Sequence, residues 1–170
     1  KYFGTHNWYE KGAERIVRAQ GAEGSWNGGG GTRPDETGTS FCLVFLSRGR
    51  APIMMSKLQY EVVDAKGRSS EGLWNQRPRE IANLTRWVGQ RIERDLNWQV
   101  VNLDAPVEEL SESPIIYMSG SAAVSLSESH RTKLKQFIEN GGMVLANADA
   151  MKLAFTDSFK KLGEAMFPNQ

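Results

Sequence analysis

A strand–helix–strand pattern in residues 114–146 constrains the fold of this chain most strongly. Residues 114–118 (Pro-Ile-Ile-Tyr-Met) are apolar throughout, as a strand that is covered on both faces should be. A segment with apolar residues at helical spacing follows, and Asn-Gly-Gly at 140–142 ends it. Residues 143–146 are a second apolar strand. Because a short helical crossover joins them, the two strands should be parallel, with a right-handed connection.

Apolar strands and amphipathic helices alternate on both sides of this unit. Residues 53–62 and 98–103 are predicted strands, and residues 64–76 between them are a predicted polar loop. Residues 78–96 are predicted to form an amphipathic helix, because apolar side chains recur there at helical spacing. A last helix is expected after residue 149, with four apolar residues at the same spacing: Phe155, Phe159, Leu162 and Met166.

This order of elements predicts the fold class. Residues 51–170 should form an α/β domain, with a mostly parallel sheet layered with helices. No predicted helix closes the second face of that sheet convincingly. We therefore expect more of this domain to lie beyond Gln170.

Polar residues at the predicted helix starts have structural interpretations. Ser125 with Glu128 fits a capping box, and Ser127 is an equally good N-cap for the same helix. Asp149 is expected to cap the last helix. The chemical alternative for Asp149 is an acid–base couple with Asp104.

The first fifty residues are predicted to form a helical hairpin. The first helix carries an apolar stripe that runs from Tyr9 to Gln20. The second helix contains the apolar run 41–46, and Thr37 or Thr39 is its predicted N-cap. The glycines at 28–31 lack the flanking elements of a phosphate-binding loop and are interpreted as a connection. A hairpin alone cannot bury both stripes, so it needs neighbours of the same kind.

The connection after the first helix contains the most specific short motif of the chain. Gln20, Gly24 and Trp26 stand in the spacing Q-x-x-x-G-x-W. This spacing resembles the QW repeat of the squalene-cyclase and prenyltransferase α/α-toroid family. The resemblance covers residues 1–50, one terminal repeat, and implies a structural clamp and further repeats upstream as partners. The family's cyclases use an Asp-rich motif, and no D-x-D-D string occurs here.

The rest of the chain, residues 51–170, resembles the bacterial domain-of-unknown-function family 4159. The matching residues are Trp74-Asn75 with Pro78, Asn83-Leu84, the string 117–120, Leu126-Ser127 and the string 141–144. The resemblance implies a fold like that of class I glutamine amidotransferases, which is a flavodoxin-like arrangement. It implies no known activity.

The amidotransferase analogy can be tested against the residues. Such an enzyme needs a nucleophilic Cys in the turn after a strand, activated by a His. The turn 147–150 reads Asn-Ala-Asp-Ala, without Cys or Ser. Cys42 lies in the other domain, and His130 is interpreted as a partly buried packing residue. We therefore expect no glutaminase activity from this segment.

Composition excludes several classes of function. With 21 Lys and Arg against 20 Asp and Glu, the net charge is +1, which argues against nucleic acid as a partner. No apolar run is long enough to span a membrane. One Cys and two His argue against a structural zinc site, so we expect no metal and no cofactor. The chain begins at Lys1, so any targeting segment is expected upstream, and the compartment stays open, cytoplasmic or extracytoplasmic.

Polar residues follow the two strands of the central unit and predict a ligand site. In open parallel sheets ligands bind beyond the carboxyl ends of the strands. The candidate residues are Ser119, Gly120, Ser121, Asn147 and Asp149. Their hydroxyl, amide and carboxylate groups suit a polyol or sugar-like ligand. The alternative is that these residues only cap helices and turn the chain.

Two classes of function follow from these observations. The first is a non-catalytic module that binds a small polar ligand or a protein partner at the end of a toroid-like repeat protein. The second is part of an isoprenoid cyclase or transferase whose active site lies in upstream repeats. Trp74, in a polar loop, is the one tryptophan that we expect to contribute to binding.

Overall fold

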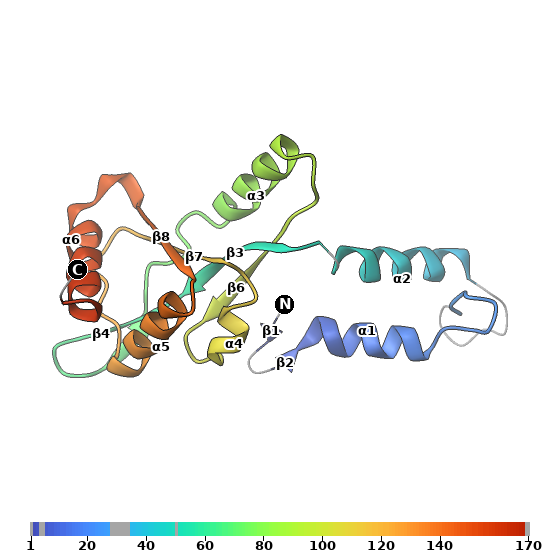
Figure 1. The fold of residues 1–170 in the computed structure, drawn as a ribbon, viewed down its shortest axis with the longest axis horizontal. Coiled ribbons are helices and arrows are strands. Elements are labelled where there is room, and N and C mark those ends of the chain that lie inside the picture. The colour runs from blue at the N-terminus through green and yellow to red at the C-terminus, as the bar shows by residue number, and fades with distance from the viewer. Residues whose placement is uncertain (1, 4–5, 28–34, 50, 169–170) are drawn as a thin grey trace. The chain divides into compact units, whose positions relative to one another are not determined.

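The chain divides into two compact units. The structure is a computed structural model that describes residues 2–3, 6–27, 35–49 and 51–168. The units are Lys1–Pro52 and Ile53–Gln170 (Figure 1). The glycines at 28–31, which we interpret as a connection, lie outside the described residues. Within the described ranges, no helix has the length and apolar character that crossing a membrane requires.

A four-stranded, all-parallel sheet forms the centre of the second unit. Its strands are β3 (Ile53–Gln59), β6 (Asn97–Asn102), β7 (Ile115–Gly120) and β8 (Met143–Ala148). They lie in the order β6-β3-β7-β8, and every neighbouring pair is parallel. The α/β prediction and the parallel pairing of β7 with β8 are confirmed. Counted along the chain the order is 2-1-3-4, as at the start of a flavodoxin-like sheet.

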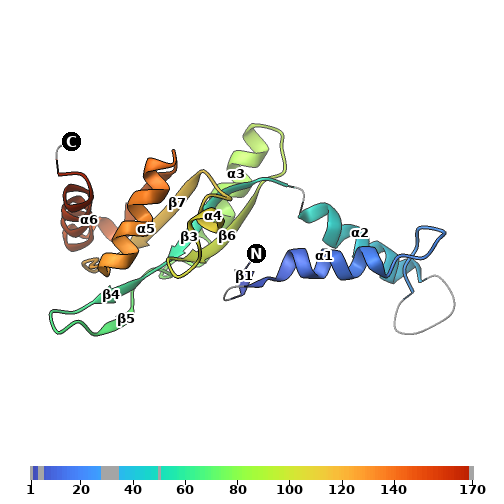
Figure 2. The ribbon, with the colours of Figure 1, turned by 60° about the horizontal axis from the view of Figure 1, so that its bottom comes forward.

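Helices cover both faces of this sheet (Figures 1 and 2). α3 (Glu80–Arg91) packs on one face, over β3 and β6. α5 (Glu128–Glu139), α6 (Leu153–Met166) and the short α4 (Val107–Leu110) pack on the other. The chain passes from β3 to β6 in one direction and from β7 to β8 in the opposite one. Because crossovers are right-handed, α3 and α5 must lie on opposite faces.

The main hydrophobic core lies between the sheet and the helices α4, α5 and α6. Its fully buried members come from alternate positions of the strands and from the inner faces of the helices: Leu58, Leu103, Leu110, Ile116, Met118, Leu134, Phe137 and Phe155. The face under α3 has a smaller core of Met55, Ile81 and Tyr117. Met143 and Leu145 stay exposed, because α3 does not extend over β8.

Two predicted segments differ in the structure. The helix predicted over 78–96 ends at Arg91, because Glu93 adopts a left-handed conformation (φ 53°) and the Arg94 N–H bonds to the Gly89 carbonyl. The predicted loop 64–76 contains the strand β5 (Ser69–Glu71), which forms a hairpin with the preceding strand β4 (Glu61–Val63). Its turn depends on Asp64, whose carboxylate accepts two backbone N–H groups, a local bond that alternating hydrophobicity does not reveal.

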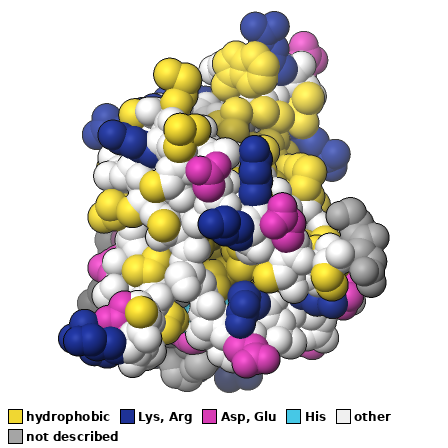
Figure 3. Space-filling model, turned by 90° about the vertical axis from the view of Figure 1, so that its left-hand side faces the viewer, with side chains coloured by type: hydrophobic (Ala, Val, Ile, Leu, Met, Phe, Trp, Pro, Cys, Tyr) yellow, Lys and Arg dark blue, Asp and Glu magenta, His cyan; other side chains and the backbone are white. Residues whose placement is uncertain are grey.

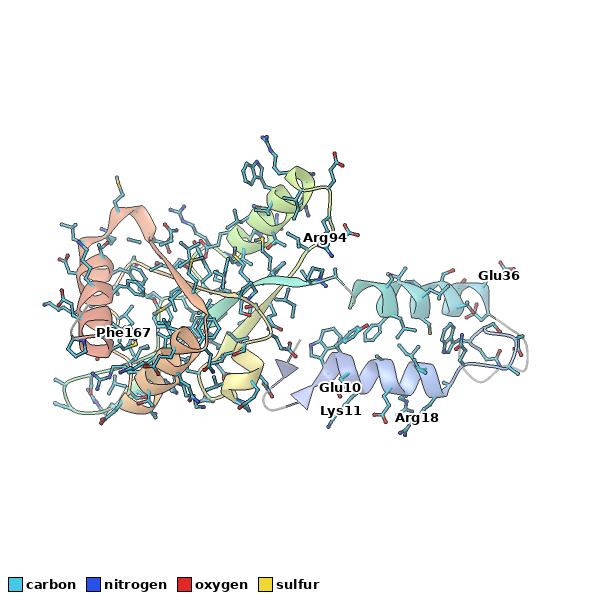
Figure 4. All side chains as sticks on the ribbon, in the orientation of Figure 1. Glu10, Lys11, Arg18, Glu36, Arg94 and Phe167 are labelled. Atoms are coloured by element: carbon cyan, nitrogen blue, oxygen red, sulfur yellow. The ribbon has the colours of Figure 1, made fainter. Side chains whose placement is uncertain are left out.

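The first unit contains two helices, as predicted. α1 (Trp8–Arg18) follows the two-residue strands β1 (Tyr2–Phe3) and β2 (His6–Asn7), and α2 is Glu36–Arg48. The N-cap of α2 is Asp35, whose carboxylate accepts from the Thr37 N–H, so the prediction of Thr37 or Thr39 is wrong. Figure 4 shows the side chains of Glu10, Lys11 and Arg18 pointing away from α2.

The Gln20, Gly24 and Trp26 motif forms contacts inside this unit. The Gln20 amide donates to the Gly24 carbonyl (2.9 Å), and Gly24 adopts φ +85°. The buried Trp26 indole donates to the carbonyl of Ile16 in the last turn of α1 (2.6 Å). The Trp26 backbone is bound by Thr39 of α2. The motif therefore ties α1 to α2.

Gly120 is a packing position. A methyl group on it would meet the Tyr60 hydroxyl at 2.3 Å and the Phe155 ring at 3.1 Å, whereas one on Gly163 in α6 would meet nothing within 4 Å. We predict that Gly120→Ala lowers the free energy of unfolding by about 1–3 kcal/mol through overpacking. Gly163→Ala should raise it by roughly 0.5–1 kcal/mol through helix propensity.

Urea denaturation of both variants is the measurement. Because the Tyr60 hydroxyl is the nearest obstacle, the loss in Gly120→Ala should shrink in the background of Tyr60→Phe. Equal effects of the two glycine substitutions would contradict the packing role of Gly120.

Candidate functional site

The predicted site lies at the ends of β7 and β8, next to the point where the strand order of the sheet reverses. β3 and β7 are neighbours, but the chain leaves them towards opposite edges of the sheet. In open α/β sheets the crevice at the carboxyl ends of two such strands is the usual ligand site. Ser119 of β7 and Asn147 of β8 are register partners at this end. Sequence spacing alone had suggested that they share an edge, and the register shows that they do.

A buried ion pair organises this end of the sheet. Lys57 of β3 is 1% exposed, and its Nζ lies 2.8 Å from Glu80 Oε1 at the start of α3. The same Nζ donates to Asn75 Oδ1 and to the Arg77 carbonyl, both at 3.1 Å. It also lies 5.7 Å from the centroid of the Trp74 ring. Lys57 therefore holds the whole 74–77 segment against the sheet.

Hydroxyl groups from β7 also bind the two oxygens of the Glu80 carboxylate. The Tyr117 hydroxyl donates to Glu80 Oε2 (3.1 Å), and the Ser119 hydroxyl lies 2.8 Å from Glu80 Oε1 and 3.2 Å from the Trp74 carbonyl. On the opposite face of the sheet, the Tyr60 hydroxyl donates to the Ser119 carbonyl (3.0 Å). Ser119 is thus buried and held from both faces.

Both tyrosines keep their protons to high pH. Burial, followed by the charge of Asp149, raises the pKa of Tyr60 to about 12. Burial, followed by the charge of Glu80, raises the pKa of Tyr117 to about 12. Each hydroxyl therefore acts as a hydrogen-bond donor over the whole physiological range.

Asp149 does not cap the last helix, so that prediction is wrong. α6 begins at Leu153 after a 3-10 turn, and the residue at its N-cap position is Lys152. The Asp149 carboxylate is 5% exposed, and neither of its oxygens has a hydrogen-bond partner among the described residues. Arg77 Nε lies 3.0 Å from Oδ1, which makes an ion pair but not an aligned hydrogen bond.

The turn that carries Asp149 is strained. Ala150 and Met151 both adopt left-handed backbone angles (φ 50° and 54°), which non-glycine residues rarely do. Strained backbone of this kind concentrates at functional sites. A strand, a sharp turn and a helix is also the arrangement of a nucleophile elbow, but residues 149–151 contain neither Ser nor Cys.

The other predicted site residues have different surroundings. Gly120 is buried against Tyr60 and Phe155, and Ser121 is half-buried just beyond the end of β7. Asn147 is exposed on the α3 face of β8. The helix after β7 begins only at Glu128, with Ser127 as its N-cap, so its free N–H groups do not adjoin Gly120.

Sequence reasoning missed Lys57, Arg77 and Glu80. One signal existed for Lys57, which is the single charged residue in the mostly apolar stretch from Ile53 to Leu58. Glu80 and Arg77 lie in segments that look like an ordinary helix start and a polar loop. Only the packing of α3 on the sheet brings them to the site.

A second polar group lies near the ends of β3 and β6. His130 Nε2 lies 3.1 Å from Asp104 Oδ1, so Asp104 pairs with His130, and the Lys133 Nζ binds three carbonyls that follow β6. A cavity of about 210 Å³ adjoins this pair, with Glu61 and Glu71 also in its lining. In the part of the chain that the structure describes, no three His, Cys, Asp or Glu side chains are placed to hold a metal ion.

The Lys57–Glu80 pair should be essential for stability. Lys57→Met leaves Glu80 with its charge unpaired in a largely buried position, and we expect a loss of about 3–5 kcal/mol in the free energy of unfolding. Arg68→Met, in the exposed Arg68–Asp64 pair, should cost less than about 1 kcal/mol. Chemical denaturation of both variants tests this, and similar losses would contradict it.

The two buried phenols predict a specific alkaline behaviour. The unfolded chain releases these protons near pH 10.0, whereas the folded protein holds them until about pH 12. Their contribution to stability is therefore complete below pH 10 and is lost as pH rises towards 12. Ultraviolet titration should resolve a late tyrosinate phase that disappears in the Tyr60→Phe, Tyr117→Phe double variant. A single phase near pH 10 in the folded protein would refute this.

Comparison with known proteins identifies the family of the second unit. The model of the family described as "Domain of unknown function (DUF4159)" matches residues 55–170, which is more than half of the chain. No curated protein and no solved structure matches the chain. The toroid resemblance of residues 1–50 therefore has no support from a relative. The chain belongs to the DUF4159 family.

Proposed function

We propose that the unit Ile53–Gln170 is a ligand-binding module and that its ligand is a small hydroxyl-rich molecule, such as a polyol or a sugar. The ligand site is the carboxyl edge of β7 and β8. Ser121, Asn147 and Asp149 contact the ligand, and Ser119 and Gly120 form the floor beneath it. The proposal assigns no catalytic step to these residues.

The Asp149 carboxylate is the observation that carries this proposal. A buried carboxylate without hydrogen-bond donors costs folding free energy, on the order of a few kcal/mol. Buried polar groups in folded proteins nearly always have partners, and an exception needs an explanation. A ligand hydroxyl would supply the missing donor. The strained turn at Ala150 and Met151 supports the same reading, because it holds Asp149 in this position.

The charges around the site favour a ligand that is both a donor and an acceptor. Lys57 is paired with Glu80, and Arg77 is paired with Asp149, so the four formal charges cancel. A hydroxyl can donate to Asp149 and accept from Arg77 or from the amide of Asn147. Two neighbouring hydroxyl groups can donate to Asp149 and accept from both Arg77 and Asn147 at the same time, which a single polar group cannot do.

Protein partners of the first unit belong to the same proposal. Phe41 is 70% exposed, and Val17, Leu43 and Val44 are also exposed along α1 and α2. Apolar helix faces of this kind suit packing against further helical repeats of the same protein. The alternative function, as part of an isoprenoid cyclase, rests on the Gln20, Gly24 and Trp26 motif, and the contacts of that motif tie the hairpin together.

Asp149→Asn tests the ligand site. In an amide chemical-shift titration of the full chain with D-glucose and myo-inositol, we expect changes at residues 119–121 and 147–149 that Asp149→Asn abolishes. Asp157→Asn, an exposed position on α6, should leave them intact. The free energy of unfolding of Asp149→Asn should not fall by more than about 1 kcal/mol, because among the described residues the variant loses an ion pair with the exposed Arg77.

Two results would reject the binding proposal. One is a set of shift changes that cluster away from these residues. The other is unchanged titration behaviour in Asp149→Asn. A purely structural Asp149 would show its effect in stability and none in the titration.

A further inference from the structure

We infer that the ligand carries a carboxylate beside its hydroxyl groups, as a sugar acid does, and that Arg77 recognises this carboxylate. The inference rests on the proposed function and names the chemical class of the ligand at that site. Arg77 thereby becomes the residue that distinguishes a sugar acid from a neutral sugar.

The Arg77 guanidinium is only partly used in the structure. Its Nε faces Asp149 Oδ1 at 3.0 Å, and the side chain is 59% exposed. Among residues 51–168, the ion pair of this guanidinium with Asp149 has its closest approach at Nε, at the edge away from the two terminal nitrogens. Those two nitrogens form a planar fork that matches the two oxygens of a carboxylate. The fork therefore stays open to solvent while the Nε edge is held by Asp149.

The position of Arg77 is fixed by its backbone. Its carbonyl accepts a hydrogen bond from the buried Lys57 Nζ (3.1 Å) and one from the Glu80 N–H (3.3 Å). Asp149 holds the Nε edge of the side chain. A donor group that is fixed at both ends loses less freedom on binding than a free surface arginine, which strengthens its contribution to affinity.

Asp149 determines which anion fits. It repels any anionic ligand, so the attraction of Arg77 must exceed this repulsion. A carboxylate carries one negative charge, whereas a phosphate monoester carries about 1.5–2 at neutral pH. Because Lys57 is already neutralised by Glu80, no second free cation of this cluster offsets the extra charge of a phosphate. The ligand then binds Arg77 through its carboxylate, and one of its hydroxyl groups donates a hydrogen bond to Asp149.

The experiment compares three ligands that share one ring: D-glucuronate, D-glucose and D-glucose 6-phosphate. The full chain is titrated with each, and affinity is followed by amide chemical shifts. We expect D-glucuronate to bind about tenfold more tightly than D-glucose, since a charge-assisted bidentate contact is stronger than a neutral one. The phosphate should bind more weakly than D-glucuronate.

Arg77→Gln identifies the residue responsible. In this variant D-glucuronate should bind no better than D-glucose, because the ratio of the two affinities depends on the charged fork of Arg77. Arg79→Gln is the matched control, because Arg79 is exposed nearby and the substitution removes the same charge. It should preserve the preference for D-glucuronate.

Each other outcome has a defined meaning. Equal binding of glucose and glucuronate, unaffected by Arg77→Gln, overturns the carboxylate inference and leaves the proposed function standing. Tighter binding of glucose 6-phosphate overturns the assignment of the anion. If Arg79→Gln removes the preference for D-glucuronate as fully as Arg77→Gln does, the preference comes from general positive charge. That result also overturns the inference. Absence of binding by all three ligands overturns both the inference and the proposed function.

Discussion

The buried Lys57–Glu80 ion pair is the interaction on which this end of the molecule depends. It joins the central strand β3 to the start of α3, and it anchors the 74–77 segment through Asn75 and the Arg77 carbonyl. Glu80 in turn binds the hydroxyls of Tyr117 and Ser119. Burying such a pair is expensive unless further hydrogen bonds satisfy both partners, and here they do. Its contribution is therefore mainly to define one arrangement of loop, helix and sheet.

Asp149 contrasts with this satisfied network. It is equally buried, yet its carboxylate has an ion pair and no hydrogen bond among the described residues, and the turn after it has two left-handed residues. Natural proteins are locally consistent except where function requires otherwise. A rigid, satisfied cluster beside a strained, unsatisfied carboxylate is the arrangement expected where a scaffold holds a binding group ready. The proposed recognition of a ligand therefore depends on Asp149 and Arg77 rather than on the hydroxyls of β7.

Prediction from sequence succeeded where a local pattern determines the outcome. The apolar strands β7 and β8 and the glycine stop between them were readable from the chain, although β7 is covered on both faces and β8 leaves Met143 and Leu145 exposed. Prediction failed where a local side-chain bond overrides periodicity, as at Asp64 in the hairpin turn and Asp35 at the start of α2, and where a left-handed residue does so, as at Glu93 after α3. The prediction that Asp149 caps the last helix failed for a related reason, because the 3-10 turn after β8 moves the helix start to Leu153.

The sequence by itself determined the fold class, the parallel pairing of β7 with β8, and the placing of Ser119 beside Asn147. These follow from the alternation of apolar strands with amphipathic helices and from the fixed hand of the crossover. Both are local properties of the chain. Only the tertiary structure decided that Lys57, Arg77 and Glu80 surround them, and that Asp149 is buried without donors. The physical reason is that these charges come from segments far apart in the chain. Their meeting depends on how α3 packs over the sheet, which no local pattern encodes.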